Sequence, residues 1–327
     1  MCSSAPEASG RLFRFEVAIN RRLRVITAFA FVYVFWGSTY LGIRIAVDHV
    51  PPILMAGARF SLAGTMMLAF CAATGRSVAV DGGRLLRLSV LGLLMLGFSN
   101  AVLAWAELAV PTGLAALIIA IVPIWVLLIE RFVLPTGERP PAGAVGGVAL
   151  GAAGVVVLVW PALGRGGGGL DRMELVACLS LLASSFCWSY GSVLSRRWQL
   201  PVDPLVASGW QMTAAGVVDL AVGLALGQHR RAAWTPAAIT AIAYLVVFGS
   251  WVGFSAYVWL LRHVPTAKVA TYAYVNPVVA VLLGWAVLGE SVDRYIVAGA
   301  AIILPAVALV TRAEHPPADG PPLTEAG

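Results

Sequence analysis

The chain repeats its own sequence pattern once, and this duplication constrains the fold more than any other feature. A Gly-Glu pair at 137–138 recurs at 289–290, which is 152 residues later. The pattern Trp-x5-Val-Pro-Thr that starts at Trp105 recurs from Trp259, an offset of 154 residues. Further matches at the 152-residue offset are Trp36 with Trp188, Arg44 with Arg196, Pro52 with Pro204, Gly57 with Gly209, and Gly64 with Gly216.

The composition is that of a membrane protein. Of the 327 residues, 60% are hydrophobic and 12% are charged, which is about half the charged fraction of a soluble domain. Ten apolar runs approach the ~20 residues that are needed to cross a bilayer. They cover 25–47, 52–73, 85–106, 109–133, 142–161, 174–194, 204–226, 236–260, 264–288 and 295–312.

Each half of the duplication contains five of these runs. Because five is odd, the second half enters the membrane from the side opposite to the first. We therefore predict an all-α integral membrane protein with ten transmembrane helices in two inverted five-helix repeats. Inverted repeats of this kind are typical of secondary transporters, whose substrate site lies between the halves.

The apolar runs and the segments between them predict five regions of the chain. A basic N-terminal tail (1–24) precedes the first repeat (25–161), and a Gly-rich linker (162–173) leads to the second repeat (174–312). Residues 313–327 follow as a C-terminal tail. Because residues 1–20 and 313–327 lack the apolar surface needed to fold, we expect these two segments to be disordered.

The positive charges indicate the orientation in the membrane. With the N-terminus in the cytoplasm, 15 of the 22 Lys and Arg residues lie on the cytoplasmic side. The positive-inside rule therefore predicts a multi-pass protein of the cytoplasmic (inner) membrane with both termini in the cytoplasm. The net charge of +6 follows from this topology and does not indicate a nucleic-acid partner. The outer side holds five positive residues, Arg165, Arg172, Arg230, Arg231 and Arg294.

The sequence lacks the motifs of several kinds of chemistry. The one lysine, Lys268, follows Ala267, so the chain has no phosphate-binding GxxxxGK[ST] loop and cannot drive transport with ATP by itself. The four histidines lie far apart in loops or a tail, and the four cysteines form no CxxC pair. We therefore predict no metal site, no cofactor and no enzymatic activity.

Charged groups inside an apolar span are costly, so they are candidates for function. Arg59 lies seven residues into the second run, or ~10 Å deep, and we expect it to meet an anion. That anion is a substrate carboxylate or phosphate, or else a structural partner such as Glu107 or backbone carbonyls. Arg44 is close enough to a span end to reach the headgroups. Asp219 and Glu107 are candidates for proton coupling. For Asp219 the alternatives are a hydrogen bond or ion pair with a neighbouring helix, or a position close enough to the outer surface to be hydrated.

Aromatic and amide side chains occur at mid-depth, where the interfacial aromatic belt does not explain them. A cavity walled by rings with a few amides would suit an amphipathic organic solute, whereas ordinary helix packing explains any single ring. The predicted substrate-binding residues are Trp36, Tyr40, Arg59, Asn100, Trp125, Trp188, Tyr190, Gln211, Trp251, Tyr257, Tyr272, Tyr274 and Asn276.

Other repeated features predict hinges, gates and helix contacts. Pro123 and Pro277 fall mid-span at related positions, where each favours a kink that acts as a hinge or only shapes its helix. Glu138 and Glu290 follow spans four and nine on opposite faces of the membrane. We expect them to stabilise closed gates by capping the following helices or by pairing with arginines. A small-residue face in span five favours packing within the bundle, or else a homodimer, and consists of Gly143, Gly147, Gly151 and Gly154.

Taken together, these motifs resemble the EamA-type transporters of the drug/metabolite transporter superfamily over residues ~25–312. The motifs that carry the resemblance are Trp36-Gly37-Ser38-Thr39-Tyr40, Met55-Ala56-Gly57-Ala58-Arg59-Phe60, the Val-Pro-Thr turns at 110 and 264, Tyr272-Ala273-Tyr274-Val275-Asn276-Pro277, and the two Gly-Glu pairs. The resemblance implies ten helices around a central cavity. It also implies export of amino acids, other metabolites or drugs across the cytoplasmic membrane without ATP. The second half departs from the first where Ser189 replaces Gly37 and Gln211 replaces Arg59.

We therefore expect a secondary transporter that exports small amphipathic metabolites by alternating access, with membrane lipid and the solute as its partners. Aromatic walls would hold the apolar part of the solute, and Arg59 or the amides would orient its polar end. A channel or a non-transporting membrane scaffold is the alternative. An intramembrane lipid-modifying enzyme would need convergent acids or a His/Ser pair at mid-depth, and the sequence contains neither.

Overall fold

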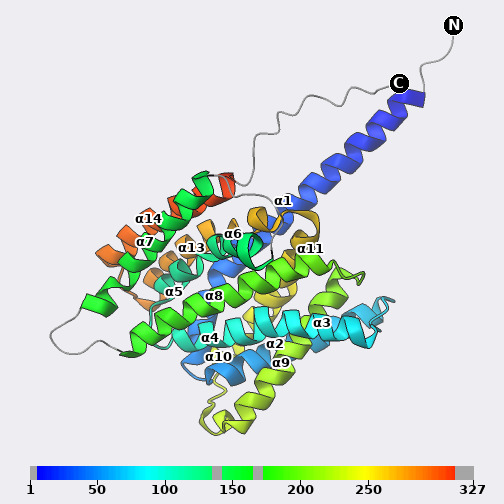
Figure 1. Cartoon of the computed structure of the whole chain (residues 1–327). Helices are drawn as coiled ribbons and strands as arrows, with labels where there is room; N and C mark the ends of the chain where they lie inside the picture. Colours follow the sequence, from blue (N-terminus) through cyan, green and yellow to red (C-terminus); the bar gives the residue numbers. More distant parts are fainter. Residues whose placement is uncertain (1–5, 135–141, 165–171, 314–327) are drawn as a thin grey trace.

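The computed structural model describes residues 6–134, 142–164 and 172–313, and every regular element in these ranges is a helix (Figure 1). The first half contains α1 (Pro6–Val47), α2 (Pro52–Ala73), α3 (Gly82–Gly92), the π-helix η1 (Leu93–Phe98), α4 (Ser99–Ala106), α5 (Thr112–Ile119), α6 (Val122–Leu128), the π-helix η2 (Ile129–Val133) and α7 (Ala142–Gly164). The helix α1 already begins at Pro6, so the basic segment before the first apolar run is helical and not the disordered tail that we expected.

The second half repeats this order of elements with two differences: a 3-10 helix follows its second helix, and it has no counterpart of η2 among the described residues. It contains α8 (Arg172–Trp198), α9 (Pro204–Ala225), the 3-10 helix η3 (Gln228–Arg231), α10 (Pro236–Tyr244), the π-helix η4 (Leu245–Phe254), α11 (Ser255–His263), α12 (Thr266–Val269), α13 (Tyr272–Leu288) and α14 (Arg294–Ala313). The tail after residue 313 and most of the Gly-rich linker lie outside the described residues.

Seven helical segments in the described ranges are long and apolar enough to cross a membrane. They are Arg22–Val47, Pro52–Ala73, Gly82–Ala106, Thr112–Val133, Arg172–Trp198, Pro204–Ala225 and Pro236–His263. Three shorter apolar helical segments, Val145–Val157, Val275–Leu288 and Arg294–Ala306, coincide with the remaining three predicted runs. The all-helical membrane fold is therefore confirmed, and the full count of ten transmembrane helices stays a prediction.

Local sequence signals explain where many of these helices begin and end. Proline occupies the first turn of α2, α9 and α10, where its missing N–H costs nothing. The Asp203 carboxylate accepts hydrogen bonds from the Leu205 and Val206 N–H groups at the start of α9, at 2.9 and 3.4 Å. Later in the second half, α13 stops at Gly289. This residue has a left-handed φ of 68°, a conformation that glycine adopts readily.

The two halves pack as related, interlocked units. The helix α2 packs against α9, and α7 packs against α14, which Figure 1 shows side by side at one edge of the bundle. The first helix of each half inserts into the other half: α1 contacts α10, η4, α11 and α13, and α8 contacts η1, α4, α5 and α6. Each repeat therefore completes the helical wall of the other, and the space between them is lined by both.

The crossing of α2 and α9 is close because glycines face it. A Cβ atom on Gly216 would lie 2.5 Å from the Phe60 carbonyl carbon and 2.7 Å from Ser61 Cα. A Cβ on the repeat-related Gly64 would collide with the backbone at Thr213. Small residues allow two helix backbones to approach to this degree.

The glycines of α7 pack within the chain. A Cβ atom on Gly154 would lie 2.6 Å from Ile303 Cγ1 of α14, and a Cβ on Gly151 would collide with Ile124 of α6. Packing inside the bundle therefore uses this part of the predicted small-residue face.

Four of the helical segments deviate from regular α-helix at repeat-related places. The third span of each half contains a π-helical stretch, η1 and η4, and π-helices occur frequently at functional sites. The fourth span of each half is interrupted, at 120–121 between α5 and α6 and at 270–271 between α12 and α13. Pro123 lies in the first turn of α6, and Pro277 lies inside α13. Pro123 therefore directly follows the interruption in the first half, whereas Pro277 lies several residues after the one in the second half, and a hinge at either proline stays a prediction. The sequence contained no signal that we recognised for the π-helices.

Candidate functional site

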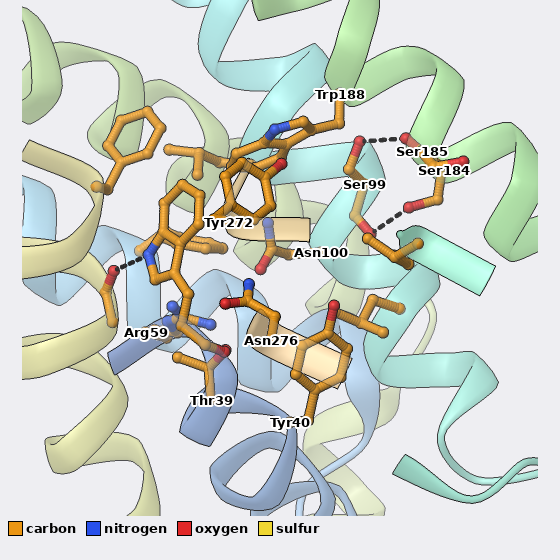
Figure 2. A pocket seen from close by; sticks show the side chains of 17 residues that line it. Thr39, Tyr40, Arg59, Ser99, Asn100, Ser184, Ser185, Trp188, Tyr272 and Asn276 are labelled. Carbon is orange, nitrogen blue, oxygen red and sulfur yellow. Dashed lines mark hydrogen bonds between the residues drawn. The ribbon is translucent and has the colours of Figure 1, made fainter. Parts of the chain in front are cut away.

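A cavity that is partly open to its surroundings lies between the two halves (Figure 2). Eight elements contribute to its wall: α1, α2, η1, α4 and α5 from the first half, and α8, η4 and α13 from the second. The lining residues are Trp36, Thr39, Tyr40, Arg59, Phe60, Leu96, Ser99, Asn100, Leu103, Ile119, Ser184, Ser185, Trp188, Gly249, Phe254, Tyr272 and Asn276.

One wall of the cavity is aromatic and is organised around Trp36. Its ring meets Trp188 and Tyr272 edge to face, with centroids 5.3 and 5.2 Å apart. The Trp36 indole Nε1 donates a hydrogen bond to the Gly249 carbonyl of η4 at 3.0 Å, which fixes the ring. Tyr257 packs behind this layer, with its ring centroid 4.8 Å from that of Trp36, and its hydroxyl accepts a hydrogen bond from Trp188 Nε1 at 3.2 Å. The wall offers flat apolar faces to a bound molecule.

Arg59 enters the cavity from α2. Its side chain is 4% exposed, its Nε donates to Ser250 Oγ at 3.1 Å, and its Cζ lies 4.6 Å from the centroid of the Phe60 ring. The Nη1 atom has no hydrogen-bond partner among the described residues. Among the described residues Arg59 forms no ion pair with a carboxylate. Glu107, the acid that we considered as its structural partner, lies beside Arg44, which donates to the Glu107 backbone carbonyl.

Amide and hydroxyl groups surround Arg59 on the other sides. Asn276 is 4% exposed and its Oδ1 has no partner in the described residues, while Asn100 Nδ2 donates to the Met95 carbonyl at 3.2 Å. Ser99 and Ser184 exchange two hydrogen bonds of 3.0 Å, each hydroxyl donating to the other residue's carbonyl. Figure 2 shows Arg59, Asn276 and Asn100 directed into the same central part of the cavity. The site therefore has a polar centre beside an aromatic wall.

Seven of the thirteen predicted substrate-binding residues line this cavity, namely Trp36, Tyr40, Arg59, Asn100, Trp188, Tyr272 and Asn276. Of the others, Trp125 lies behind the lining and donates to Ser185 Oγ at 3.0 Å. Trp251 points toward α2 and donates to the Ala63 carbonyl at 2.9 Å. Tyr257 supports the aromatic wall from behind, and Tyr190 stacks on Phe186 at 6.3 Å. Gln211 is buried in α9 away from the lining, and the side chain of Tyr274 lies outside the described residues.

Ten further residues line the cavity that were not predicted from the sequence to bind substrate: Thr39, Phe60, Leu96, Ser99, Leu103, Ile119, Ser184, Ser185, Gly249 and Phe254. Most are apolar or small residues that look the same in sequence whether they face lipid, a neighbouring helix or a cavity. The adjacent serines of α8 offered the best available signal, because two hydroxyls in one turn of an apolar span need partners.

Glu290 holds the two halves together at one end of the cavity. Its carboxylate accepts hydrogen bonds from the Thr112 N–H at 3.0 and 3.1 Å and from Thr112 Oγ1 at 2.8 Å. It therefore caps the start of α5 in the other half, whereas we expected it to cap the helix that follows it or to pair with an arginine. Asp293 performs that role for α14, with its Oδ1 2.9 and 2.8 Å from the first N–H groups. Glu138, the related residue of the first half, lies outside the described residues.

The remaining charged candidates lie outside the cavity. The Arg44 guanidinium donates to the Glu107 carbonyl and lies 3.3 Å from Asp48. The related Arg196 donates in the same way to the Val264 carbonyl. Both arginines thus cap the end of the third span in their own half, which is a structural role.

The two candidate acids are both buried. Glu107 is fully buried, and neither of its carboxyl oxygens has a hydrogen-bond partner among the described residues. Asp219 is 8% exposed and lies in α9 beside η1, where a Cβ on Gly97 would be 3.5 Å from Asp219 Oδ1. Its Oδ2 has no hydrogen-bond partner in the same ranges. Within the described residues, no three His, Cys, Asp or Glu side chains gather as metal ligands would.

A helical membrane bundle with a partly polar cavity between two related halves has the architecture of a membrane transporter. The chain belongs to the EamA-like transporter family, whose model matches residues 23–160 and again residues 175–312. The two matches correspond to the two halves of the duplication.

Individual relatives agree with this assignment. The chain is 37% identical over 286 residues to an inner membrane transporter of Escherichia coli K12, the uncharacterized YedA, with 87% of this chain and 89% of that protein covered. It is 23% identical over 290 residues to a Salmonella typhimurium LT2 protein named "Probable amino-acid metabolite efflux pump", covering 84% of this chain and 90% of that one. A crystal structure with 21% sequence identity shares the fold, with a TM-score of 0.63 over 88% of this chain and 96% of its own.

Proposed function

We propose that the protein is a secondary transporter that exports small amphipathic organic solutes across the cytoplasmic membrane. Its ten helices would form two inverted repeats, and the solute would bind in the cavity between them. The observation that carries this proposal is the cavity itself, which is built from both halves and combines an aromatic wall with a buried cation and amides. The family and the efflux pump named among the relatives support export of a metabolite.

Alternating access requires contacts between the halves that can be broken at either end of the cavity. At the end we assign to the outside, Glu290 binds Thr112 and the Gln228 side chain accepts from the Leu54 N–H at 2.9 Å. In both pairs the two residues come from different halves. Opening the cavity to the outside would require these contacts to separate.

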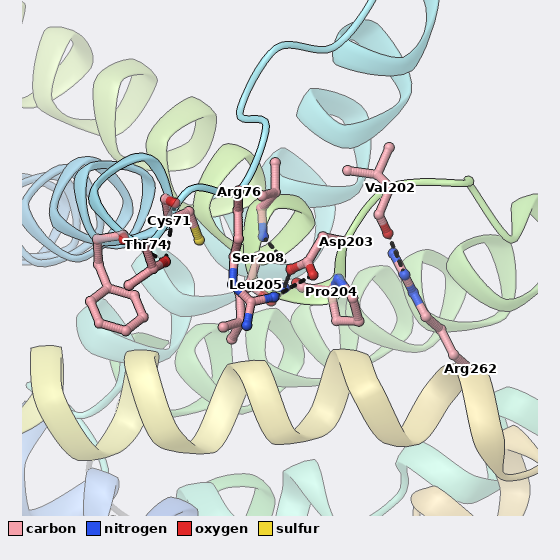
Figure 3. Close-up of polar contacts among 11 residues, drawn as sticks. Cys71, Thr74, Arg76, Val202, Asp203, Pro204, Leu205, Ser208 and Arg262 are labelled. Carbon is pink, nitrogen blue, oxygen red and sulfur yellow. Dashed lines mark hydrogen bonds and ion pairs between the residues drawn. The ribbon is translucent and has the colours of Figure 1, made fainter.

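At the opposite end, Arg76 in the loop after α2 forms an ion pair with Asp203, the residue that caps α9 (Figure 3). Arg262 holds the loop between α8 and α9, which contains Asp203, by donating to the Val202 carbonyl. Arg76 and Gln228 are related by the 152-residue offset, so one end has an ion pair where the other has a neutral hydrogen bond. With both termini in the cytoplasm, the Arg76–Asp203 pair belongs to the cytoplasmic gate.

Two buried acids are our candidates for coupling transport to protons. Glu107 lies at the end of the third span, and Asp219 lies near the outer end of α9. Each has at least one carboxyl oxygen without a hydrogen-bond partner among the described residues, so each is free to gain or lose a proton as a gate opens. If Asp219→Asn and Glu107→Gln both retain the full stimulation by an imposed pH gradient, proton coupling through these residues is refuted.

Counterflow in proteoliposomes tests the proposed function. Vesicles loaded with an unlabelled solute receive the labelled solute outside, and a carrier gives uptake stimulated by the internal solute. A channel gives flux that is linear in concentration without this stimulation, and a scaffold gives none. Protein-free vesicles are the control, and a monodisperse profile on gel filtration shows that the protein is folded. Absence of stimulated uptake for amino acids, organic acids and cationic drugs alike would refute the carrier.

A further inference from the structure

The cavity contains one net positive charge. Of the described residues that line it, Arg59 alone is charged, and no acidic side chain lines it. A buried cation without a partner is costly, because the protein interior does not replace the lost hydration. The most direct source of compensation is an anionic group on the solute. A cationic solute would instead add like charge to the same low-dielectric space.

The geometry of Arg59 restricts the anion to a single group. Ser250 already occupies the Nε donor, and the Phe60 ring lies against the guanidinium at 4.6 Å, so the terminal edge formed by Nη1 and Nη2 is available to the solute, and Nη1 has no hydrogen-bond partner among the described residues. A guanidinium edge matches a planar carboxylate. A group with two negative charges would leave one of them uncompensated.

A second unsatisfied atom near the cation sets another requirement. The Asn276 Oδ1 has no hydrogen-bond partner among the described residues, and Asn276 points into the same central part of the cavity as Arg59 (Figure 2). A buried amide oxygen without a donor costs free energy, so the bound solute should present an O–H or N–H to it. Because no acidic side chain lines the cavity, this donor does not need to be charged.

The aromatic wall provides for the rest of the solute. The rings of Trp36, Trp188 and Tyr272 are held in edge-to-face contact beside the polar centre. A flat or branched apolar group gains from such faces both by burial and by ring–ring contact.

We propose that the cavity selects an organic monocarboxylate with an apolar ring and a neutral hydrogen-bond donor near its carboxylate, and that it rejects cations. Export of such acids follows only if the proposed transport function is correct, and this part of the inference rests on it. In this complex Arg59 binds the carboxylate, Asn276 accepts from the donor, and the aromatic wall packs on the ring. The charge comes from Arg59 of the first half only, because the related residue of the second half, Gln211, is neutral and does not line the cavity. The solute therefore binds in one orientation.

A matched series of four compounds with one ring tests the inference: 3-phenyllactate, its neutral amide, phenylalanine as the zwitterion, and phenethylamine as the cation. Binding to the purified protein is measured by thermal stabilisation and by tryptophan fluorescence, neither of which requires transport. Loss of one charge-assisted contact costs about ten-fold or more in affinity. We therefore expect phenyllactate to bind at least about ten-fold more tightly than the amide, and phenethylamine not to compete.

Variants then identify the residues responsible. Arg59→Gln should abolish the preference for the acid over the amide, and Arg59→Lys should retain part of it because the charge remains. Arg230→Gln removes an exposed arginine and should leave the preference unchanged. If Arg59→Gln does not fold, Asn276→Leu replaces it and should reduce the preference for 3-phenyllactate over 3-phenylpropionate, which lacks the hydroxyl.

Three results would overturn the inference. They are equal binding of the acid and the amide, competition by the cation, and no binding of any of the four compounds. An unchanged acid preference in Arg59→Gln would have the same effect. Binding of phenyllactate without counterflow would instead contradict the proposed transport function and leave the binding assignment intact.

Discussion

Replacing Gly216 with alanine should destabilise the contact between the two halves where α2 crosses α9. The added Cβ would lie 2.5 Å from the Phe60 carbonyl carbon and 2.7 Å from Ser61 Cα, whereas ordinary van der Waals contact begins at 3.4 Å. Both neighbours are backbone atoms and cannot rotate away. The nearest atom is the Ser61 backbone nitrogen, with which the Cβ would collide, so the two helices would have to separate by more than about 1 Å to remove the overlap.

The magnitude follows from two opposing contributions. Overpacking of a tight interior costs about 1–3 kcal/mol, while replacing a helical glycine by alanine gains roughly 0.5–1 kcal/mol. The net loss for Gly216→Ala therefore lies between about 0 and 2.5 kcal/mol, and toward the upper end because the clash is with backbone atoms. Gly146→Ala in α7 is the matched control, because nothing lies within 4 Å of a Cβ built there and only the helix-propensity gain remains.

Thermal unfolding of the purified variants in one detergent, followed by tryptophan fluorescence, measures the difference. We expect Gly216→Ala to melt below the wild-type protein and Gly146→Ala to melt at or above it. If Gly216→Ala melts with or above Gly146→Ala, the close approach of the helices is wrong and the description of the interface between the halves fails with it.

Three further predictions concern single contacts. Glu290→Gln keeps an acceptor at the start of α5 but removes its charge, so it should lower the free energy of unfolding by about 1 kcal/mol in denaturant titrations; an unchanged midpoint would contradict the cap. Asp203→Asn should cost under about 1 kcal/mol, because the partly exposed ion pair with Arg76 is worth little and asparagine also caps helices. Asp203→Ala should cost about 1 kcal/mol more, and equal melting temperatures for the two variants would refute the cap. Trp36→Phe keeps the ring and leaves the Gly249 carbonyl without its donor, so it should lower stability by about 1–3 kcal/mol, whereas wild-type stability would show that the hydrogen bond is dispensable.

The duplication, the apolar runs and the two related prolines were sufficient to predict the helical membrane fold. Hydrophobic length is a strong signal, and the matches at the 152-residue offset predicted which helices would have equivalent neighbours. The boundaries were predicted less well at the N-terminus, where α1 extends back to Pro6. An α-helix satisfies its backbone hydrogen bonds without burying apolar surface, so hydropathy does not detect the helical segment before the first apolar run.

The site was predicted in part, and the failures have a physical cause. Polar or aromatic residues of α1, α2 and α13 were identified because such groups are rare at mid-depth. Trp251 was assigned to the cavity, yet it donates to Ala63 of α2, while Gly249 and Phe254 line the cavity. These two lie five residues apart on the π-helix η4, a spacing that places them on different faces of a regular α-helix. Without knowledge of the π-helix, the sequence alone assigns the wrong face.

Repeat symmetry misled the prediction at one position. Gln211 is related to Arg59 and was expected at the site, but it lies in α9 away from the cavity lining. Equivalent backbone positions therefore do not contribute equivalent side chains to this cavity.

The most direct test of the account is whether the solute passes through the cavity. Asn100→Trp would place a large ring in the cavity, and Leu282→Trp would place the same ring on the exposed surface of α13, where Leu282 is 57% exposed. We predict that counterflow is lost in Asn100→Trp and retained in Leu282→Trp, with both proteins monodisperse on gel filtration. Wild-type counterflow in a folded Asn100→Trp variant would show that the solute does not pass through this cavity.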